Sequence, residues 1–319
     1  MDKLQFKPKS RIKEFLGEKT IAVTAFAALV AIMLIFIFIF KESLPIFHDE
    51  FVKEEASLDK MVFKQEYVEG RDPKWSWQPN SDIPKYSLLP LFIGTLKAAI
   101  IAMLFAVPLG VGAAIYSAEF ASRRMREFIK PVIELLAGIP SVVLGFFALI
   151  VMATFLQNIF GFTYRLNAIN AGVALGLAVI PIIFTMAEDA MTSVPQSLRD
   201  ASLALGASPW QVSMTVVLPT ALPGIAASII LGFGRAIGET MIVLMASGNA
   251  AVISASFTDS IRTVSATIAS ELAEVVFGSA HYNVLFFLGT LLFIFTFLLN
   301  MGGDIVLNRL KERFQGKIS

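Results

Sequence analysis

Six stretches of the chain are long and apolar enough to cross a lipid bilayer as helices. A helix needs about 20 mostly apolar residues to cross the hydrocarbon core. The stretches cover residues 20–40, 88–116, 131–156, 168–191, 219–246 and 284–307. The pattern therefore predicts an all-α membrane protein with six transmembrane helices.

The polar segments between these stretches divide the chain into five parts. The first stretch is too long, and too poor in a small-residue cleavage site, for a signal peptide, so we expect a retained helix. The parts are a cytoplasmic segment (1–19), the first transmembrane helix (20–40), an extracytoplasmic acidic segment (41–87), a core domain with five transmembrane helices (88–307) and a cytoplasmic tail (308–319). Acidic residues outnumber lysines in the acidic segment, so we expect it to be solvated or to contact an external protein.

Lysine and arginine positions predict the orientation of the helices. They concentrate in three places, namely the amino terminus, the loop after the second stretch and the carboxyl terminus. The two short loops assigned to the outside are poor in positive charge, with Arg165 in one and Arg262 in the other. Cytoplasmic loops carry an excess of these residues, so we expect both termini in the cytoplasm.

Small residues recur every four positions in the fifth stretch. They are Gly224, Ser228, Gly232 and Ala236. Such a stripe lets a second helix approach closely, which predicts a packed bundle. The alternative is that membrane helices use more glycine in general.

Composition agrees with a membrane protein and excludes several kinds of site. Hydrophobic residues make up 56% of the chain and charged residues 16%, which is typical of membrane proteins. The absence of cysteine removes disulfides, thiolate metal sites and cysteine nucleophiles. Since His48 and His281 lie far apart in the sequence, we expect no metal site. The basic residues form no single face, so we expect no nucleic-acid partner.

The segment between the fourth and fifth stretches, residues 197–219, is too polar to cross a membrane. Its apolar positions nevertheless keep a helical spacing on either side of Gly206. Ser208 followed by Pro209 is typical of a helix start. The pattern predicts two short helices joined by a glycine turn. A hairpin of this kind with an apolar face suits docking by a cytoplasmic partner.

This segment resembles the EAA loop of ABC importer permeases, whose pattern is Glu-Ala-Ala, three residues, Gly, nine residues, Ile, one residue, Leu-Pro. The matching positions are Asp200, Ala201, Ser202, Gly206, Val216, Leu218 and Pro219. Asp, Ser and Val are conservative replacements in this pattern. The resemblance implies a type I ABC importer permease fold, in which residues 197–219 are the ATPase-coupling loop and residues 88–307 are the core permease domain.

Three further segments resemble the PstC-type permeases of phosphate importers. They are YSLLPLFIGTL from Tyr86, IELLAGIPSVVLGFFAL from Ile133 and GFGRAIGETMIV from Gly232. The resemblance implies a subunit that passes inorganic phosphate across the cytoplasmic membrane of a bacterium or archaeon by alternating access. The implied partners are an ATP-binding subunit used as a dimer, a PstA-type second permease, an extracytoplasmic phosphate-binding protein and membrane lipid.

The chain lacks the residues for P-loop ATP hydrolysis. No GxxxxGK[ST] motif occurs in it, and its two histidines lie in unrelated segments, so no nucleophilic triad is supported. We therefore expect a transport subunit without catalytic residues or a cofactor, driven by a separate ATPase.

Arg235 and Glu239 are the main candidates for the substrate path. An arginine at the bilayer centre costs at least about 2.5 to 3.5 kcal/mol, so it should face protein, water or substrate. The spacing of four residues places both on one helix face. One reading is a structural ion pair. The other is an anion path, in which the guanidinium holds two phosphate oxygens and Glu239 orients it.

Lys97, early in the second stretch, is a further path candidate. Its ammonium either snorkels to the lipid headgroups or draws anions into an outer vestibule. Near the inner ends of the third and fourth stretches lie Glu134, Glu188 and Asp189. We interpret these carboxylates as interfacial and structural.

Three other functions stay open at this stage. They are a permease for another oxyanion such as sulfate or molybdate, a secondary transporter that uses Arg235 and Glu239 as an ion relay, and a scaffold without a transport role. Copurification of an ATPase through residues 197–219 separates an ABC permease from a secondary transporter.

Overall fold

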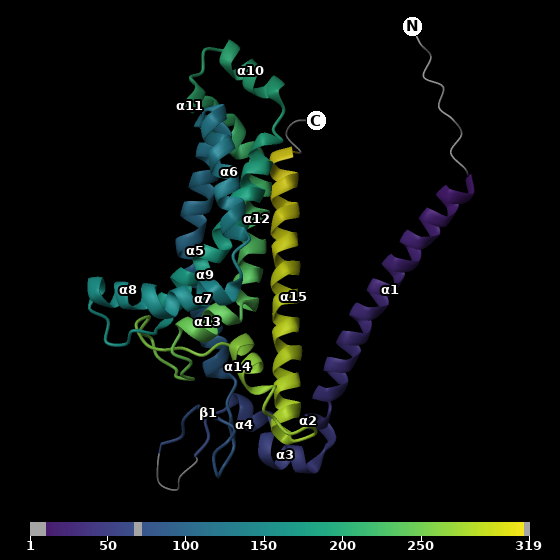
Figure 1. The fold of residues 1–319 in the computed structure, drawn as a ribbon, viewed down its shortest axis with the longest axis vertical. Helices are drawn as coiled ribbons and strands as arrows, with labels where there is room; N and C mark the ends of the chain where they lie inside the picture. Colours follow the sequence, from purple (N-terminus) through teal and green to yellow (C-terminus); the bar gives the residue numbers. More distant parts are fainter. Residues whose placement is uncertain (1–10, 67–71, 316–319) are drawn as a thin grey trace.

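The computed structural model describes residues 11–66 and 72–315, which are almost entirely helical (Figure 1). Six helical segments of the described residues are long and apolar enough to cross a membrane, as predicted. They are Phe15–His48, Leu89–Phe120, Ser141–Phe160, Ala168–Thr192, Pro209–Gly238 and Ala280–Arg309. The first ten and last four residues, within the expected cytoplasmic segments, lie outside the described residues, as do residues 67–71 of the acidic segment.

Four long helices form the centre of the molecule. They are α5 (Leu89–Ile115), α9 (Ala168–Thr192), α12 (Leu218–Gly238) and α15 (Ala280–Gln315). Helices α5 and α9 pack along their length, and α12 packs against α9 and α15 (Figure 1). A Cβ added at Gly172 of α9 would lie 2.5 Å from the Ile101 side chain of α5. Small residues thus allow the close backbone approach on which helix packing in lipid depends.

Helix α1 (Arg11–Ser43) stands apart from this centre. It contacts α15 at one end and leans away from it toward the amino terminus (Figure 1). None of the residues in its most apolar window is buried by the rest of the chain. Its apolar surface is therefore left for lipid or for another subunit.

The predicted small-residue stripe of α12 packs against α9. Ser228 and Ala236 are buried. A Cβ added at Gly224 would lie 2.4 Å from the Ala190 side chain, and one added at Gly232 would lie 3.0 Å from side chains of α9. The stripe is therefore a helix-packing surface, as expected, and general glycine enrichment does not account for it.

The third predicted span, residues 131–156, has different bounds in the structure. Helix α6 (Arg123–Ala137) is a separate helix that ends at Gly138, and α7 (Ser141–Phe147) begins after Pro140. Proline lacks a backbone N–H and disfavours a helical residue before it, so α6 cannot continue through this point. The segment that is long and apolar enough to cross a membrane consists instead of α7, the π-helix η2 (Ala148–Met152) and α8 (Ala153–Phe160).

The fifth predicted span, residues 219–246, contains a break. Helix α12 ends at Gly238, Glu239 is extended with φ −69° and ψ 135°, and α13 (Met241–Ala246) begins after Thr240. At the other end, α11 (Pro209–Val212) and the π-helix η3 (Ser213–Val217) lead directly into α12. The span therefore lies about ten residues earlier than predicted, at Pro209–Gly238.

The acidic segment, which the sequence predicts to be solvated or to contact an external protein, is largely folded within the described residues. It contains α2 (Pro45–His48), α3 (Glu50–Ala56), α4 (Leu58–Val62) and a hairpin of β1 (Trp77–Gln78) and β2 (Lys85–Tyr86). Ile46, Val52 and Met61 are buried in one cluster with Leu285 and Leu288 of α15. The segment packs at the end of the bundle opposite the coupling loop (Figure 1).

Candidate functional site

The break after α12 places Arg235 and Glu239 in different local structures. Arg235 lies in the last turn of α12, where a positive charge complements the helix dipole. Glu239 follows the helix in an extended conformation. The prediction that the two lie one turn apart on a single helix is therefore wrong. Gly238, which has a low helix propensity, is the point at which α12 ends.

Neither charged side chain has a polar partner within the described part of the chain. Arg235 is exposed and Glu239 is half-buried. Only the backbone of Glu239 is engaged, since its carbonyl oxygen accepts a hydrogen bond from Ser265 Oγ at 2.7 Å. The donors of the guanidinium are consequently open to solvent, a ligand or another subunit.

A hollow of about 500 Å³ lies beside the break. Its lining residues are Gly238, Thr240, Ser265, Ile268, Ala269, Leu272, Ala273 and Leu292. Gly238, the last residue of α12, and Thr240 place this hollow at the break. The hydroxyls of Thr240 and Ser265 are the polar side-chain groups of this lining.

Lys97 makes contacts that differ from both sequence-based interpretations. Its Nζ donates hydrogen bonds to the carbonyl oxygens of Ser254 and Ser256, the second at 3.0 Å. The ammonium also lies 5.7 Å from the centre of the Phe257 ring. Lys97 therefore holds the loop that follows α13, and its charge is engaged by this chain.

The predicted coupling loop consists of two short helices, α10 (Gln196–Ala204) and α11. Gly206 between them has a φ of +87°, a left-handed conformation that favours glycine. Ser208 and Gln211 form a reciprocal capping box at the start of α11. The predicted glycine turn between two helices is confirmed, but the second helix is not a separate short one, because it continues through η3 into α12.

The coupling loop presents an open surface at one end of the molecule (Figure 1). Asp200 and Ala201 are exposed, Ser202 is half-buried, and α10 has no buried residue. Leu205 is 90% exposed and Trp210 is 60% exposed. Large apolar side chains gathered at a surface mark a contact with a partner.

A buried arginine attaches α10 to the bundle. Arg199 Nη1 donates to both carboxylate oxygens of Glu119 at 2.7 Å, and its Nη2 donates to the Met191 carbonyl oxygen at 2.9 Å. Glu119 belongs to the π-helix η1 (Tyr116–Phe120) at the end of α5, and Met191 belongs to α9. One side chain thus joins α10 to two helices. The sequence does not predict this pair, because its partners lie 80 residues apart.

The other end of the coupling loop runs directly into α12. Leu218 and Pro219 are the first two residues of that helix, so a displacement of the loop moves the helix that bears Arg235. At the same end, Lys130 of α6 pairs with the buried Glu188 of α9 at 2.8 Å. This ion pair agrees with the structural role inferred for Glu188.

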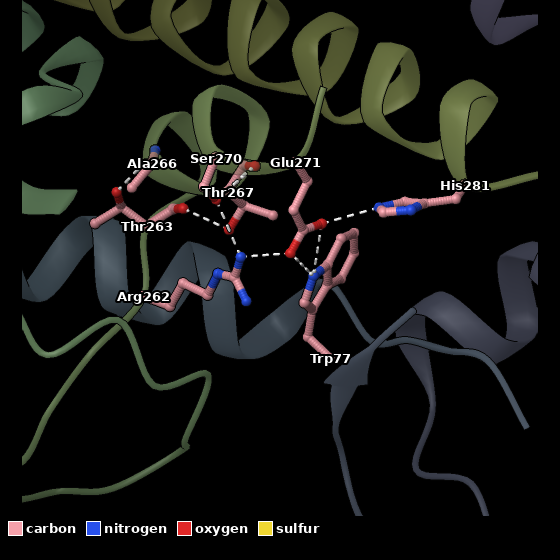
Figure 2. A network of polar contacts seen from close by, with 8 residues as sticks. All are labelled: Trp77, Arg262, Thr263, Ala266, Thr267, Ser270, Glu271 and His281. Atoms are coloured by element: carbon pink, nitrogen blue, oxygen red, sulfur yellow. Dashed lines mark hydrogen bonds and ion pairs between the residues drawn. The ribbon is translucent and has the colours of Figure 1, made fainter. Parts of the chain in front are cut away.

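At the opposite end of the molecule, Glu271 is the centre of a polar network (Figure 2). Its carboxylate accepts hydrogen bonds from Trp77 Nε1 at 3.1 and 3.2 Å, contacts His281 Nε2 at 2.9 Å and pairs with Arg262. Burial acts to raise the pKa of Glu271. The hydrogen bond with His281, the charge of Arg262 and the hydrogen bond from Trp77 outweigh it, so this pKa lies below its ordinary value.

This network joins three parts of the chain that the sequence does not connect. Trp77 belongs to the acidic segment, Glu271 ends α14 (Val264–Glu271), and His281 lies in the first turn of α15. Trp77 and Glu271 are 194 residues apart, so no local pattern could have identified the contact. The segment between α13 and α15 contains one arginine, Arg262, but several carboxylates, so the sequence does not single out Glu271.

Similarity to known proteins identifies the family. Residues 106–316 match the family of binding-protein-dependent transport system inner membrane components. The chain is 36% identical to the probable ABC transporter permease protein YqgH of Bacillus subtilis, over 70% of this chain and 72% of that protein. It is 35% identical to the phosphate transport system permease protein PstC of Mesorhizobium japonicum, over 75% of this chain and 78% of that protein.

Solved structures share the fold. A chain of a bacterial ABC transporter that imports alginate matches with a TM-score of 0.62 at 14% identity, over 94% of this chain and 99% of that chain. A chain of the inward-facing MetNI methionine ABC transporter matches with a TM-score of 0.53 at 21% identity, over 70% and 94%. The architecture is thus that of type I ABC importer permeases. With the sequence matches, this shows that the chain belongs to the PstC-type permeases, multi-pass inner membrane components of binding-protein-dependent transport systems.

Proposed function

We propose that this chain is one of two permease subunits of an ATP-driven phosphate importer and passes inorganic phosphate across the cytoplasmic membrane by alternating access. Its relatives at 34% and 35% identity are named phosphate transport system permeases. The observation that carries the proposal is the exposed Arg235, which stands at a helix break and has no polar partner within the described residues. Its guanidinium can hold two phosphate oxygens in a bidentate fork.

Arg235 and Glu239 line the phosphate path in this proposal. Glu239 is half-buried and lies just beyond the end of the helix that bears Arg235, so its carboxylate balances the local charge when no anion is bound. Lys97 is occupied by backbone carbonyls. Its proposed role is therefore to hold the loop after α13 beside the path.

The energy comes from a separate ATP-binding subunit that is used as a dimer and docks on the coupling loop. The exposed Leu205 and Trp210 supply the apolar part of that contact. A PstA-type second permease completes the membrane domain. A phosphate-binding protein delivers phosphate at the end that carries the acidic segment. In this orientation both termini lie in the cytoplasm, in agreement with the distribution of lysine and arginine.

The test is competition for uptake in membrane vesicles that carry the whole complex. We expect unlabelled phosphate to suppress uptake of labelled phosphate, and sulfate and molybdate at the same concentration to leave it unchanged. Equal competition by sulfate would contradict the assignment of phosphate. Uptake that persists without the ATP-binding subunit would contradict the ABC mechanism.

A further inference from the structure

Helix α14 makes polar contacts with two distant parts of the chain. Near its amino end, Ser265 Oγ donates to the Glu239 carbonyl oxygen at the break. At its carboxyl end, the Glu271 carboxylate accepts the hydrogen bonds of Trp77 from the acidic segment (Figure 2). The helix has eight residues and is about 12 Å long. It therefore connects the acidic segment with the break beside Arg235 over a short distance.

Contacts with α5 limit how far α14 can shift sideways. The backbone N–H of Val264 donates to Thr95 Oγ1 at 3.1 Å. A Cβ added at Gly94 would lie 2.2 Å from the Arg262 carbonyl oxygen, so the two backbones are in direct contact there. Val264, Ala266 and Thr267 are buried. A close-packed element of this kind moves as a unit rather than bending.

The contacts of Glu271 are strong because they are withdrawn from water. Trp77 is 3% exposed, and the side chains of Arg262 and Glu271 are 15% and 14% exposed. Hydrogen bonds to a charged group in such surroundings contribute more than neutral ones. The Trp77 Nε1–H loses its acceptor if the Glu271 carboxylate moves away. Glu271 therefore adds a charged contact to the apolar cluster in which Val264 of α14 and Trp77 of the acidic segment are buried together.

We infer that Glu271 is a positioning residue for transport. Through α14 it holds the break at Glu239 in a fixed position relative to the acidic segment. The end of α12 that carries Arg235 is held with the break. The acidic segment is then a mechanical part of the transporter, because a displacement of this segment is carried through α14 to the break. The consequence for transport rests on the proposed function, whereas the connection itself can be measured without phosphate.

The experiment uses a single cysteine placed at the break. Because the chain contains no cysteine, Thr240→Cys supplies its one thiol, which lies in the hollow beside Glu239. The assembled complex in membrane vesicles is treated with a membrane-impermeant maleimide, and labelling is read on this chain. We expect Glu271→Gln to change the labelling rate by about tenfold, the effect of losing one charge-assisted hydrogen bond on a local opening equilibrium. An unchanged rate would overturn the inference.

Glu274→Gln is the matched control for Glu271→Gln. Glu274 is exposed, lies three residues away and lines a hollow next to Glu271. Its substitution removes the same charge without breaking a contact between α14 and the acidic segment, so the labelling rate should stay at the parent value. A change as large as that of Glu271→Gln would show that only local charge matters, and would also overturn the inference.

A milder variant guards against misfolding. Trp77→Phe keeps an aromatic ring against Tyr86 and removes only the Nε1–H donor, so it should shift labelling in the same direction as Glu271→Gln. Trp75→Phe removes a bond to the Val62 carbonyl oxygen inside the acidic segment and should leave labelling unchanged. Equal effects of the two variants would indicate general loosening and contradict the inference.

Uptake measured on the same vesicles separates this inference from the proposed function. If Arg235→Gln leaves uptake normal while Glu271→Gln changes labelling, the phosphate path is wrong and the connection through α14 stands. If Arg235→Gln abolishes uptake while Glu271→Gln changes neither labelling nor uptake, the path stands and the connection is wrong.

Discussion

Two arginines in this protein have opposite surroundings. Arg199, at the coupling end, has a side chain that is 15% exposed and donates to both oxygens of Glu119 and to the Met191 carbonyl. Arg235, in the last turn of α12, is exposed and has no polar partner within the described residues. The first attaches the coupling loop to the bundle, and the second is exposed near the break that ends α12.

The difference in burial distinguishes the two roles: Arg199 stabilises the fold, whereas Arg235 is left available to bind a ligand or another subunit. A buried charge whose partner is missing costs about 3 to 5 kcal/mol, so the docking of α10 requires that Arg199 is paired. The chain does not bury Arg235, and its donors stay open to a ligand or to a second subunit. An unpaired arginine in a membrane helix marks a functional surface because lipid is a poor environment for its charge.

The largest effect is expected for Arg235→Gln. Phosphate uptake by the assembled complex should fall by at least about 100-fold, because a bidentate charge-assisted contact is lost, while ATP hydrolysis persists. Labelled phosphate uptake and ATP hydrolysis are measured on the same vesicles. Normal uptake would contradict the path hypothesis. Recovery of uptake on adding Glu239→Gln would make the two residues a structural pair.

Arg199→Gln should lower the stability of the folded chain. It leaves Glu119 buried without its counter-charge, so the free energy of unfolding should fall by about 3 kcal/mol. Thermal unfolding of the purified complex measures this, and the exchange of both residues, Arg199→Glu with Glu119→Arg, should recover part of the loss.

The control for Arg199→Gln is Arg123→Gln, which breaks a pair with Glu127 whose side chains are 93% and 64% exposed. Its effect should stay below about 0.5 kcal/mol. Equal losses in the two variants would remove the distinction between buried and exposed arginine pairs on which the comparison rests.

Lys97→Met tests an intermediate case. The substitution removes the bonds to the Ser254 and Ser256 carbonyls, so local stability should fall by about 1 to 2 kcal/mol. Hydrogen exchange in residues 254–258 should become faster, and uptake should fall by less than about tenfold. A collapse of uptake like that of Arg235→Gln would assign Lys97 to the path instead.

The smallest expected effect is a pH dependence of the thermal stability that Glu271 contributes. Its pKa in the folded chain lies below the ordinary value of 4.5, and Arg262 and His281 are the titratable groups that contact its carboxylate. A carboxyl group whose pKa is lower in the folded than in the unfolded chain stabilises the fold at pH values above its unfolded pKa. This stabilisation is lost as the pH falls through the folded pKa. The difference in thermal stability between the parent and Glu271→Gln should therefore shrink as the pH falls below about 4.5. A difference that grows on acidification would contradict this assignment.

Local patterns were enough to predict several elements correctly. Gly206 takes the positive φ that a glycine turn implies, and Ser208 caps α11. The stripe that contains Ser228 and Gly232 packs against α9. Each depends on residues a few positions apart, where chain geometry already decides which side chains meet.

Other elements were predicted with the wrong bounds or the wrong surroundings. Apolar composition continues through Pro140 and past Glu239, although the helices end there, because an average over a span does not register a single break. The acidic segment reads as polar, yet Ile46 and Met61 are buried against residues of α15. Its apolar positions are few and acquire their partners only from distant helices.

The amino-acid sequence by itself determined the number of apolar spans, the helix-packing face of α12 and the glycine turn of the coupling loop. These features follow from hydropathy and from contacts between near neighbours in the chain. Only the tertiary structure decided which charges are paired. Arg199 meets Glu119 across 80 residues and Trp77 meets Glu271 across 194, whereas Arg235 and Glu239, four residues apart, do not pair because the helix ends between them. Charge pairing depends on short distances in space, and those distances exist only once the helices have packed.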